Sequence, residues 1–123
     1  MPQQIWVINS SQGGNDNADL IGCKIKQTDT GFDFTDPDND VLSSTTATSP
    51  TFTFESIALD DHNWTVTVET LTGGPGNNQA SGSWSNDDPT IQGVEDGTWV
   101  AQAGGGAEKG DDADDEIASK AAL

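Results

Sequence analysis

The feature that most constrains the fold is an alternation of apolar and polar residues with a period of two. It is clearest over residues 64–69, which read Trp-Thr-Val-Thr-Val-Glu. Alternation of this kind places every second side chain on one face of a strand, whereas an amphipathic helix needs apolar residues three or four positions apart. Shorter stretches of the same pattern recur up to about residue 103. We therefore expect strands in this part of the chain and little helix.

Seven short strands are predicted, separated by segments rich in Gly, Asn, Asp, Ser, Thr and Pro. This pattern is typical of an all-β fold, either a small antiparallel β-sandwich or a Greek-key barrel. A chain of 123 residues fits one such domain. The expected strands are residues 4–9, 20–27, 31–35, 51–58, 63–71, 80–85 and 97–103.

The composition changes after residue 103. Residues 104–106 are three glycines, and the segment that follows is acidic and contains no aromatic residue. We therefore divide the chain into a β domain, 1–103, and a Gly-rich linker with an acidic C-terminal tail, 104–123. Acids at its start and a lysine near its end make 111–123 a candidate short helix, because this order suits the helix dipole.

The charge balance excludes one class of partner. The chain has 21 acidic residues against four lysines and no arginine, which gives a formal net charge of −17. Such a surface repels phosphate groups, so we expect no direct nucleic-acid binding and no binding to anionic membranes. Cations, basic proteins and neutral polar ligands such as glycans remain possible partners. Solubility and adaptation to high salt are equally good explanations of the acidity.

Neither a disulfide framework nor a membrane segment is expected. Cys23 is the only cysteine, and no apolar run approaches the ~20 residues of a membrane helix. The first residues lack the basic start and long apolar run of a signal peptide. We expect a cytoplasmic protein, or one released without a signal peptide, or a virion component if its role is structural.

Three predicted loops are long for so small a domain, namely 10–19, 36–50 and 72–79. With seven antiparallel strands these loops would share one rim, and 59–62 and 86–96 would share the other. Loops on a rigid sheet often carry binding residues. The ligand-binding candidates from the long loops are Asp16, Asp19, Asn77 and Asn78.

Among the four tryptophans, Trp84 is the strongest candidate for an exposed stacking platform, because it lies between two serines and close to several acids. Tryptophan faces stack on sugar rings and anchor interfaces. The alternative is that Trp84 belongs to the core of a half-buried strand.

Asp36, Asp38 and Asp40 alternate as the first ligands of a calcium loop do. An EF-hand is excluded, because Val41 and Ala47 occupy the positions that require Gly and Glu. We retain the three aspartates as a candidate Ca²⁺ site. The alternative is a turn whose Asp side chains bind their own backbone.

Residues 39–44, Asn-Asp-Val-Leu-Ser-Ser, overlap this segment and resemble the calcium signature of the βγ-crystallins. That signature has two acids or amides, two spacers and two hydroxyl residues. The resemblance implies calcium binding at this segment, but it covers only these six residues and no convincing second copy follows.

No catalytic motif is convincing, and we expect the protein not to be an enzyme. Asp29-Thr30-Gly31 resembles the aspartic-protease triplet, yet its polar surroundings favour a turn. His62 is the only histidine, and the chain has no Gly-x-Ser-x-Gly elbow that would present a nucleophilic serine.

Three functional hypotheses follow. The leading one is a non-catalytic, lectin-like module that binds a glycan or similar polar ligand through its loops. The second is a structural subunit, such as a capsid-decorating or fibre protein, that self-assembles through strand edges or the tail. The third is an acidic decoy that occupies the basic groove of a DNA-binding protein.

Overall fold

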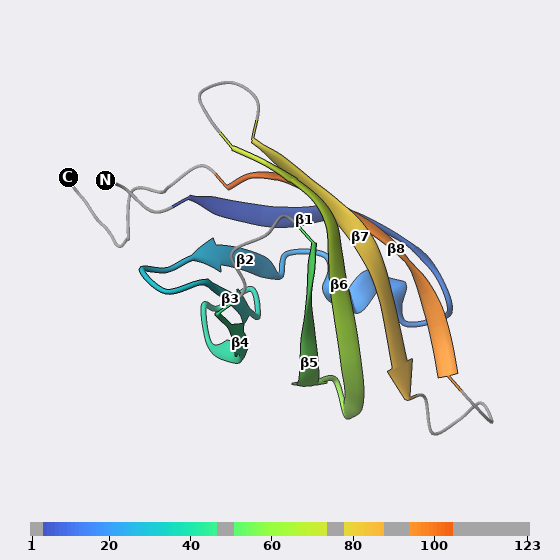
Figure 1. Ribbon diagram of the computed structural model, residues 1–123. Helices are drawn as coiled ribbons and strands as arrows, with labels where there is room; N and C mark the ends of the chain where they lie inside the picture. Colours follow the sequence, from blue (N-terminus) through green and yellow to red (C-terminus); the bar gives the residue numbers. More distant parts are fainter. Residues whose placement is uncertain (1–3, 47–50, 74–77, 88–93, 105–123) are drawn as a thin grey trace.

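The computed structural model describes residues 4–46, 51–73, 78–87 and 94–104, which form strands and one short 3-10 helix. The expectation of an all-β domain is confirmed (Figure 1). Residues 105–123, with the candidate helix, lie outside the described residues. The elements are β1 (Ile5–Gly13), η1 (Asn17–Leu20), β2 (Lys24–Gln27), β3 (Phe32–Thr35), β4 (Val41–Thr45), β5 (Phe52–Leu59), β6 (His62–Thr72), β7 (Gln79–Asp87) and β8 (Val94–Ala103).

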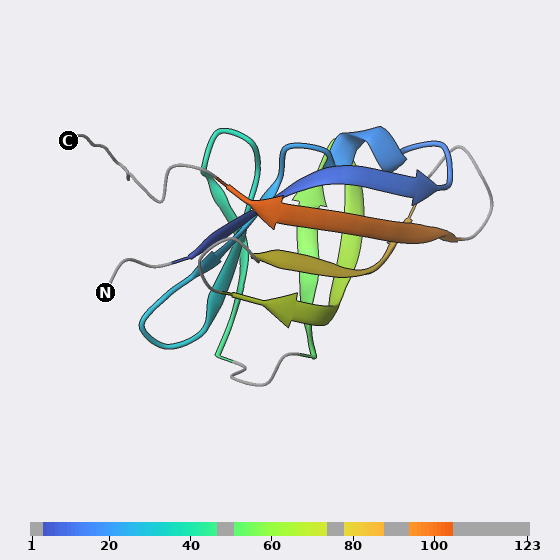
Figure 2. The same cartoon turned by 90° about the horizontal axis from the view of Figure 1, so that it is seen from above.

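The strands form one antiparallel sheet that curls into a nearly closed barrel (Figure 2). Their order is β4-β3-β2-β1-β8-β7-β6-β5. Consecutive strands are therefore paired, except β4 with β5, and the pairing of β1 with β8 joins the two halves of the sheet. Strands β4 and β5 end the order, and between them the Ser43 hydroxyl donates to the Glu55 carbonyl oxygen at 3.0 Å. The prediction of a small antiparallel all-β domain is confirmed. The described strands number eight where seven were expected, and they follow an up-and-down order in place of the expected Greek key.

Strand β4 lies inside residues 36–50, which were predicted to be a loop, so that prediction is wrong for Val41–Thr45. The sequence of β4, Val-Leu-Ser-Ser-Thr, lacks clear alternation, and none of its residues is fully buried. Its ladder partner is β3, and the paired residues run from Val41 opposite Thr35 to Thr45 opposite Phe32. An edge strand with little buried surface has no need of an apolar face, which explains why its sequence resembles a loop.

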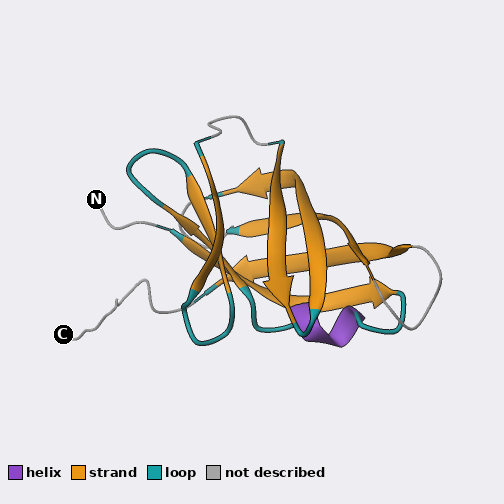
Figure 3. Ribbon diagram, turned by 90° about the horizontal axis from the view of Figure 1, so that it is seen from below, coloured by secondary structure: helices purple, strands orange, loops and turns teal. Residues whose placement is uncertain are grey.

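The additional strand changes which connections share an end of the barrel. We name the η1 end after residues 14–23, which lie there with the turns 36–40 and 60–61. Figure 3 shows η1 beside the β5–β6 turn. The side chains of Asp16 and His62 meet at this end. The prediction that 59–62 lies on the rim opposite 10–19 is therefore wrong.

The connection 72–79 lies at the other end, where the Asn78 carbonyl oxygen accepts the Ala103 N–H at 2.8 Å. Its predicted place beside 10–19 is wrong for the same reason. In an up-and-down barrel, each strand that is missed moves every later connection to the opposite end.

The barrel interior is filled by aromatic and aliphatic side chains, including all four tryptophans, each at most 2% exposed. Three of the four indole N–H groups donate to backbone carbonyl oxygens, those of Trp6 to Thr72 at 3.0 Å, Trp64 to Leu59 at 2.8 Å and Trp99 to Ser83 at 3.0 Å. Each large apolar side chain buried in this way contributes roughly 1.5–3 kcal/mol. These indoles therefore tie the core to the strand backbones.

Two inward-facing glycines make room for the indole rings. A Cβ at Gly82 would lie 3.0 Å from the Trp99 ring and 1.8 Å from the Thr67 carbonyl oxygen. A Cβ at Gly97 would lie 2.8 Å from the Trp84 ring. The rings of Trp99 and Trp84 thus lie over glycines of the neighbouring strand.

Among the residues that the structure describes, no helix is long and apolar enough to cross a lipid bilayer.

Candidate functional site

Polar side chains gather at the η1 end, where η1, β6, β7 and β8 meet. His62 lies at its centre. Its Nε2 is 3.1 Å from Asp16 Oδ2, and its Nδ1 is 3.0 Å from the Asp87 carbonyl oxygen. A carbonyl oxygen only accepts, so Nδ1 carries the hydrogen. When Nε2 is also protonated, the ring is a cation paired with the Asp16 carboxylate.

The β5–β6 turn brings two further carboxylates to this end. Asp60 and Asp61 have positive φ angles of 54° and 64°, as a two-residue hairpin turn between Leu59 and His62 requires. Asp19 on η1 shares a hydrogen bond with Asp60. Burial, this hydrogen bond and the charges of nearby carboxylates raise the pKa of Asp19 to about 6. In mildly acidic solution Asp19 is therefore largely protonated and can donate its hydrogen to Asp60.

Glu95 on β8 fixes the loop that carries Asp16. Its side chain is 8% exposed, and its two carboxylate oxygens accept the backbone N–H groups of Asn15 at 2.8 Å and Asp16 at 3.3 Å. A carboxylate that accepts backbone N–H groups makes charge-assisted hydrogen bonds, stronger than neutral ones. Glu95 thus positions Asp16 opposite His62.

Asn86 on β7 lies beneath this network and is 2% exposed. Its Nδ2 is 3.5 Å from Asp16 Oδ2, at the upper limit of a hydrogen bond, and its Oδ1 has no partner among the described residues. Asn86 is the ladder partner of both Trp64 and Glu95. The amide therefore links the polar end of the barrel to its aromatic interior.

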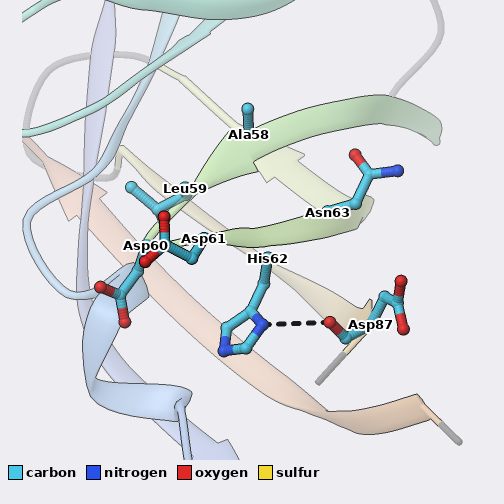
Figure 4. A pocket seen from close by; sticks show the side chains of 7 residues that line it. All are labelled: Ala58, Leu59, Asp60, Asp61, His62, Asn63 and Asp87. Carbon is cyan, nitrogen blue, oxygen red and sulfur yellow. Dashed lines mark hydrogen bonds between the residues drawn. The ribbon is translucent and has the colours of Figure 1, made fainter. Parts of the chain in front are cut away.

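An open hollow of about 650 Å³ adjoins the network at the β5–β6 turn (Figure 4). In this view the His62 ring and the side chains of Asp60 and Asp61 surround the hollow, and a dashed line joins His62 to Asp87. The hollow offers carboxylate and amide groups to a ligand that approaches from solvent. Its lining residues are Ala58, Leu59, Asp60, Asp61, His62, Asn63 and Asp87.

The three candidate calcium ligands lie in a turn whose side chains form hydrogen bonds with its own backbone. Asp36 Oδ1 accepts the backbone N–H groups of Asp38 and Asp40, both at 2.9 Å. Lys24 Nζ donates to Asn39 Oδ1 at 2.8 Å and so adds a cation to the same turn. Within the described ranges, no three His, Cys, Asp or Glu side chains are arranged to hold a metal ion. These contacts match the alternative stated above, a turn in which an Asp side chain accepts hydrogen bonds from the turn's own backbone.

Cys23 lies in the core at 0% exposed. Burial, together with the charges of Asp36 and Asp19, raises the pKa of its thiol to about 12. The sulfur is therefore a protonated thiol at neutral pH, and it lies 3.7 Å from the Asp19 carbonyl oxygen. It packs as a small apolar side chain and is not activated as a nucleophile.

The structure brings together only some of the predicted ligand-binding residues. Asp16 and Asp19 both lie at the η1 end, whereas Asn78 lies at the opposite end and Asn77 falls outside the described residues. Trp84 is 2% exposed inside the barrel, so it cannot stack on a ligand at the outer surface. For this residue the core alternative is confirmed.

Sequence reasoning did not select several residues of the site as ligand-binding candidates, namely Asp60, Asp61, His62, Asn86 and Glu95. Asp16 lies 46 residues from His62 and about 80 from Glu95 in the chain, so only the strand register brings them together. The register of β7 with β8 places Asn86 opposite Glu95. That register is seen only in the structure, so the sequence alone did not show that these two residues are neighbours.

Comparison of the chain with family models, curated proteins and solved structures found no match.

Proposed function

We propose that this protein is a non-catalytic binding module that holds a neutral, hydroxyl-bearing ligand such as a sugar at the η1 end. The observation that carries the proposal is the open hollow lined by Asp61, His62 and Asn63, continuous through His62 with the Asp16 carboxylate. Carboxylate and amide groups accept from and donate to hydroxyl groups, as a glycan site requires.

Two features support binding over catalysis. Both ring nitrogens of His62 already have partners, so neither is free to take a proton from a nucleophile. Cys23 is buried as a thiol. The site is polar and preorganised, but it lacks a general base next to an activated nucleophile in the part of the chain that is described.

A glycan array followed by calorimetry of the full chain tests the proposal. We expect saturable binding of at least one glycan, weakened about tenfold by Asp61→Asn, because an amide is a weaker acceptor than a carboxylate. Asp29→Asn, at the opposite end of the barrel, is the matched control and should leave affinity unchanged. Absence of glycan binding would reject the proposal, as would equal effects of the two variants.

A second candidate function is self-assembly, and the open side of the barrel favours it. Strands β4 and β5 each form a ladder on one side only, and Val41 on β4 is 55% exposed. Unpaired strand edges can pair with another chain. Light scattering after size exclusion should then give a mass well above 12.8 kDa, and Val41→Lys should reduce it. A monomer at all concentrations would exclude this function.

A further inference from the structure

Two lysines lie side by side on the outer face of β2. Lys24 and Lys26 are separated by Ile25, which faces the core at 0% exposed, so both lysine side chains leave the sheet on its outer face. They are the only lysines in the described part of the chain, and the chain has no arginine. On a molecule of net charge −17, an acidic group therefore meets the least repulsion here.

The charges of the two lysines are not neutralised by their neighbours. Lys24 Nζ donates to Asn39 Oδ1 at 2.8 Å and to a backbone carbonyl oxygen at 3.3 Å, and neither acceptor carries a net charge. Lys26 lies opposite Asp33 in the β2–β3 ladder, but Asp33 Oδ1 accepts the Ser44 hydroxyl at 2.7 Å. Among the described residues, no ion pair joins either lysine to a carboxylate. Both ammonium groups can therefore pair with a further acidic group.

Two aliphatic side chains of β1 lie next to the lysines. Ile5 is the ladder partner of Lys26, and Val7 is the ladder partner of Lys24. Residues directly opposite in a ladder lie on the same face of the sheet, so these four side chains form one block on the outside of the barrel. Both aliphatic side chains are half-buried. We name this block of two cations and two apolar side chains the β1–β2 face.

The described chain leaves the barrel beside this face. The Gly104 N–H donates to the Ile5 carbonyl oxygen at 2.8 Å, so Gly104 extends β8 next to Ile5. A Cβ at Gly104 would lie 2.5 Å from Val7 Cγ2, because the valine side chain leans over the glycine. Lys26, Ile5 and Gly104 thus lie in one row across β2, β1 and β8. Neighbouring strands are about 5 Å apart, which places the Lys26 backbone about 10 Å from Gly104.

The sequence after Gly104 has the composition that the β1–β2 face would bind. Five of the six residues 111–116 are acidic, and Ile117 follows them directly. Glycines at 105, 106 and 110 allow the chain to reverse its direction, because glycine adopts left-handed conformations readily. Asp111 is seven residues beyond Gly104. At about 3.3 Å per extended residue, this linker spans up to about 23 Å, so the acids can reach both lysines.

We propose that residues 111–117 of this chain fold back onto the β1–β2 face, with the carboxylates paired with the two lysines and Ile117 packed on the two aliphatic side chains. Exposed ion pairs are individually weak and are screened by salt. A segment on a short linker, however, has an effective concentration on the order of millimolar at a surface of its own chain, which compensates for weak pairing. The inference is independent of the proposed function, because the hollow lies at the β5–β6 turn and not on β1 or β2.

A spin label next to the proposed segment tests the contact in the full chain. Ser119→Cys supplies a single reactive thiol, because Cys23 is 0% exposed and its thiol stays protonated. A nitroxide attached there broadens nearby amide resonances of the ¹⁵N-labelled protein. In low salt the amides of the β1–β2 face should lose most of their intensity, whereas the amide of Thr67, on the outer face of β6, should keep its intensity. At 0.5 M NaCl the loss should largely disappear, because salt screens the ion pairs.

Substitutions on the barrel with opposite expected effects provide the matched comparison. The double variant Lys24→Gln, Lys26→Gln removes both charges and keeps polar side chains, so it should abolish the intensity loss. Asp33→Asn removes the carboxylate opposite Lys26 and should deepen the loss. Full intensity at the β1–β2 face of the native barrel in low salt would overturn the inference. So would equal losses in the native barrel and in the double variant.

A mixing experiment separates this contact from one made by the tail of another copy. When spin-labelled ¹⁴N protein is mixed with ¹⁵N protein that carries no spin label, only contacts between copies broaden the ¹⁵N resonances. The inference requires that the β1–β2 face keeps its intensity in this mixture. A loss of intensity there would show that the face takes the tail of a second copy, and would overturn the inference.

Discussion

Glu95 is the residue whose loss should affect the candidate site most. Glu95→Ala would leave the backbone N–H groups of Asn15 and Asp16 without their carboxylate. We expect a loss of about 2–3 kcal/mol in the free energy of unfolding, measured by urea denaturation. Asp96→Ala removes the neighbouring, exposed carboxylate and should change stability by less than about 0.5 kcal/mol. Similar values for both variants would contradict the anchoring role of Glu95.

Asp19 should make stability depend on pH with an unusual sign. Its pKa is raised from 3.8 to about 6 in the folded protein, so the folded state binds this proton more tightly than the unfolded state does. The contribution of Asp19 to stability is therefore present below about pH 4 and is lost as the pH rises to about 6.

Asp19→Asn removes this titration. At pH 7 the variant should be more stable than the native protein by about 1 kcal/mol, after allowance for solvent screening, because Asp19 is half-buried and its partner Asp60 is exposed. At pH 4 the difference should vanish. Thermal unfolding of both proteins between pH 4 and 7 measures it, with Asp38→Asn as control. A difference that does not vary with pH would show that the pKa of Asp19 is not raised in the folded protein.

At the scale of the element, the packing of β6, β7 and β8 depends on Gly82. A methyl group there would lie 1.8 Å from the Thr67 carbonyl oxygen and would also press on Trp99. We expect Gly82→Ala to destabilise the protein by about 3 kcal/mol or more, because the backbone carbonyl cannot move aside without breaking the β6–β7 ladder. Chemical denaturation measures this effect, and the outward Ser83→Ala should be nearly neutral. A stable Gly82→Ala variant would show that the two strands are farther apart than described.

Strands could be predicted from the sequence where one face of the strand is buried and the other is exposed to solvent. Strand β6 has Trp64, Val66 and Val68 at 0% exposed, and its alternation is plain. Strand β4 has no fully buried residue, so its sequence carries no such alternation and the strand was missed.

That one omission also explains why the site was only half predicted. Asp16 and Asp19 were found because they lie in a polar loop, but their partners were assigned to the opposite rim. The contacts of Asp16 with His62 and Asn86 depend on the number and register of the strands between them. No local pattern encodes such a distant contact.

At the scale of the whole molecule, the charge of −17 should make stability depend on salt. Self-repulsion of like charges weakens the compact state, and salt screens it over a Debye length of about 10 Å at 0.1 M. We expect the melting temperature to rise by several degrees between 10 mM and 0.5 M NaCl. KCl at the same ionic strength should have the same effect. A melting temperature that does not change with salt would show that the acids are arranged without net repulsion.

The pairing of β1 with β8 has a consequence for how the chain reaches its fold. Trp6 pairs with Ala103, so this ladder closes a loop of nearly the whole domain, whereas every other ladder joins consecutive strands. Contacts between residues far apart in the chain slow folding. A circular permutant that links Gly104 to Gln4 and begins at Thr51 would place all eight strands in spatial order. Stopped-flow refolding should be faster for this permutant, because its sheet can grow one hairpin at a time.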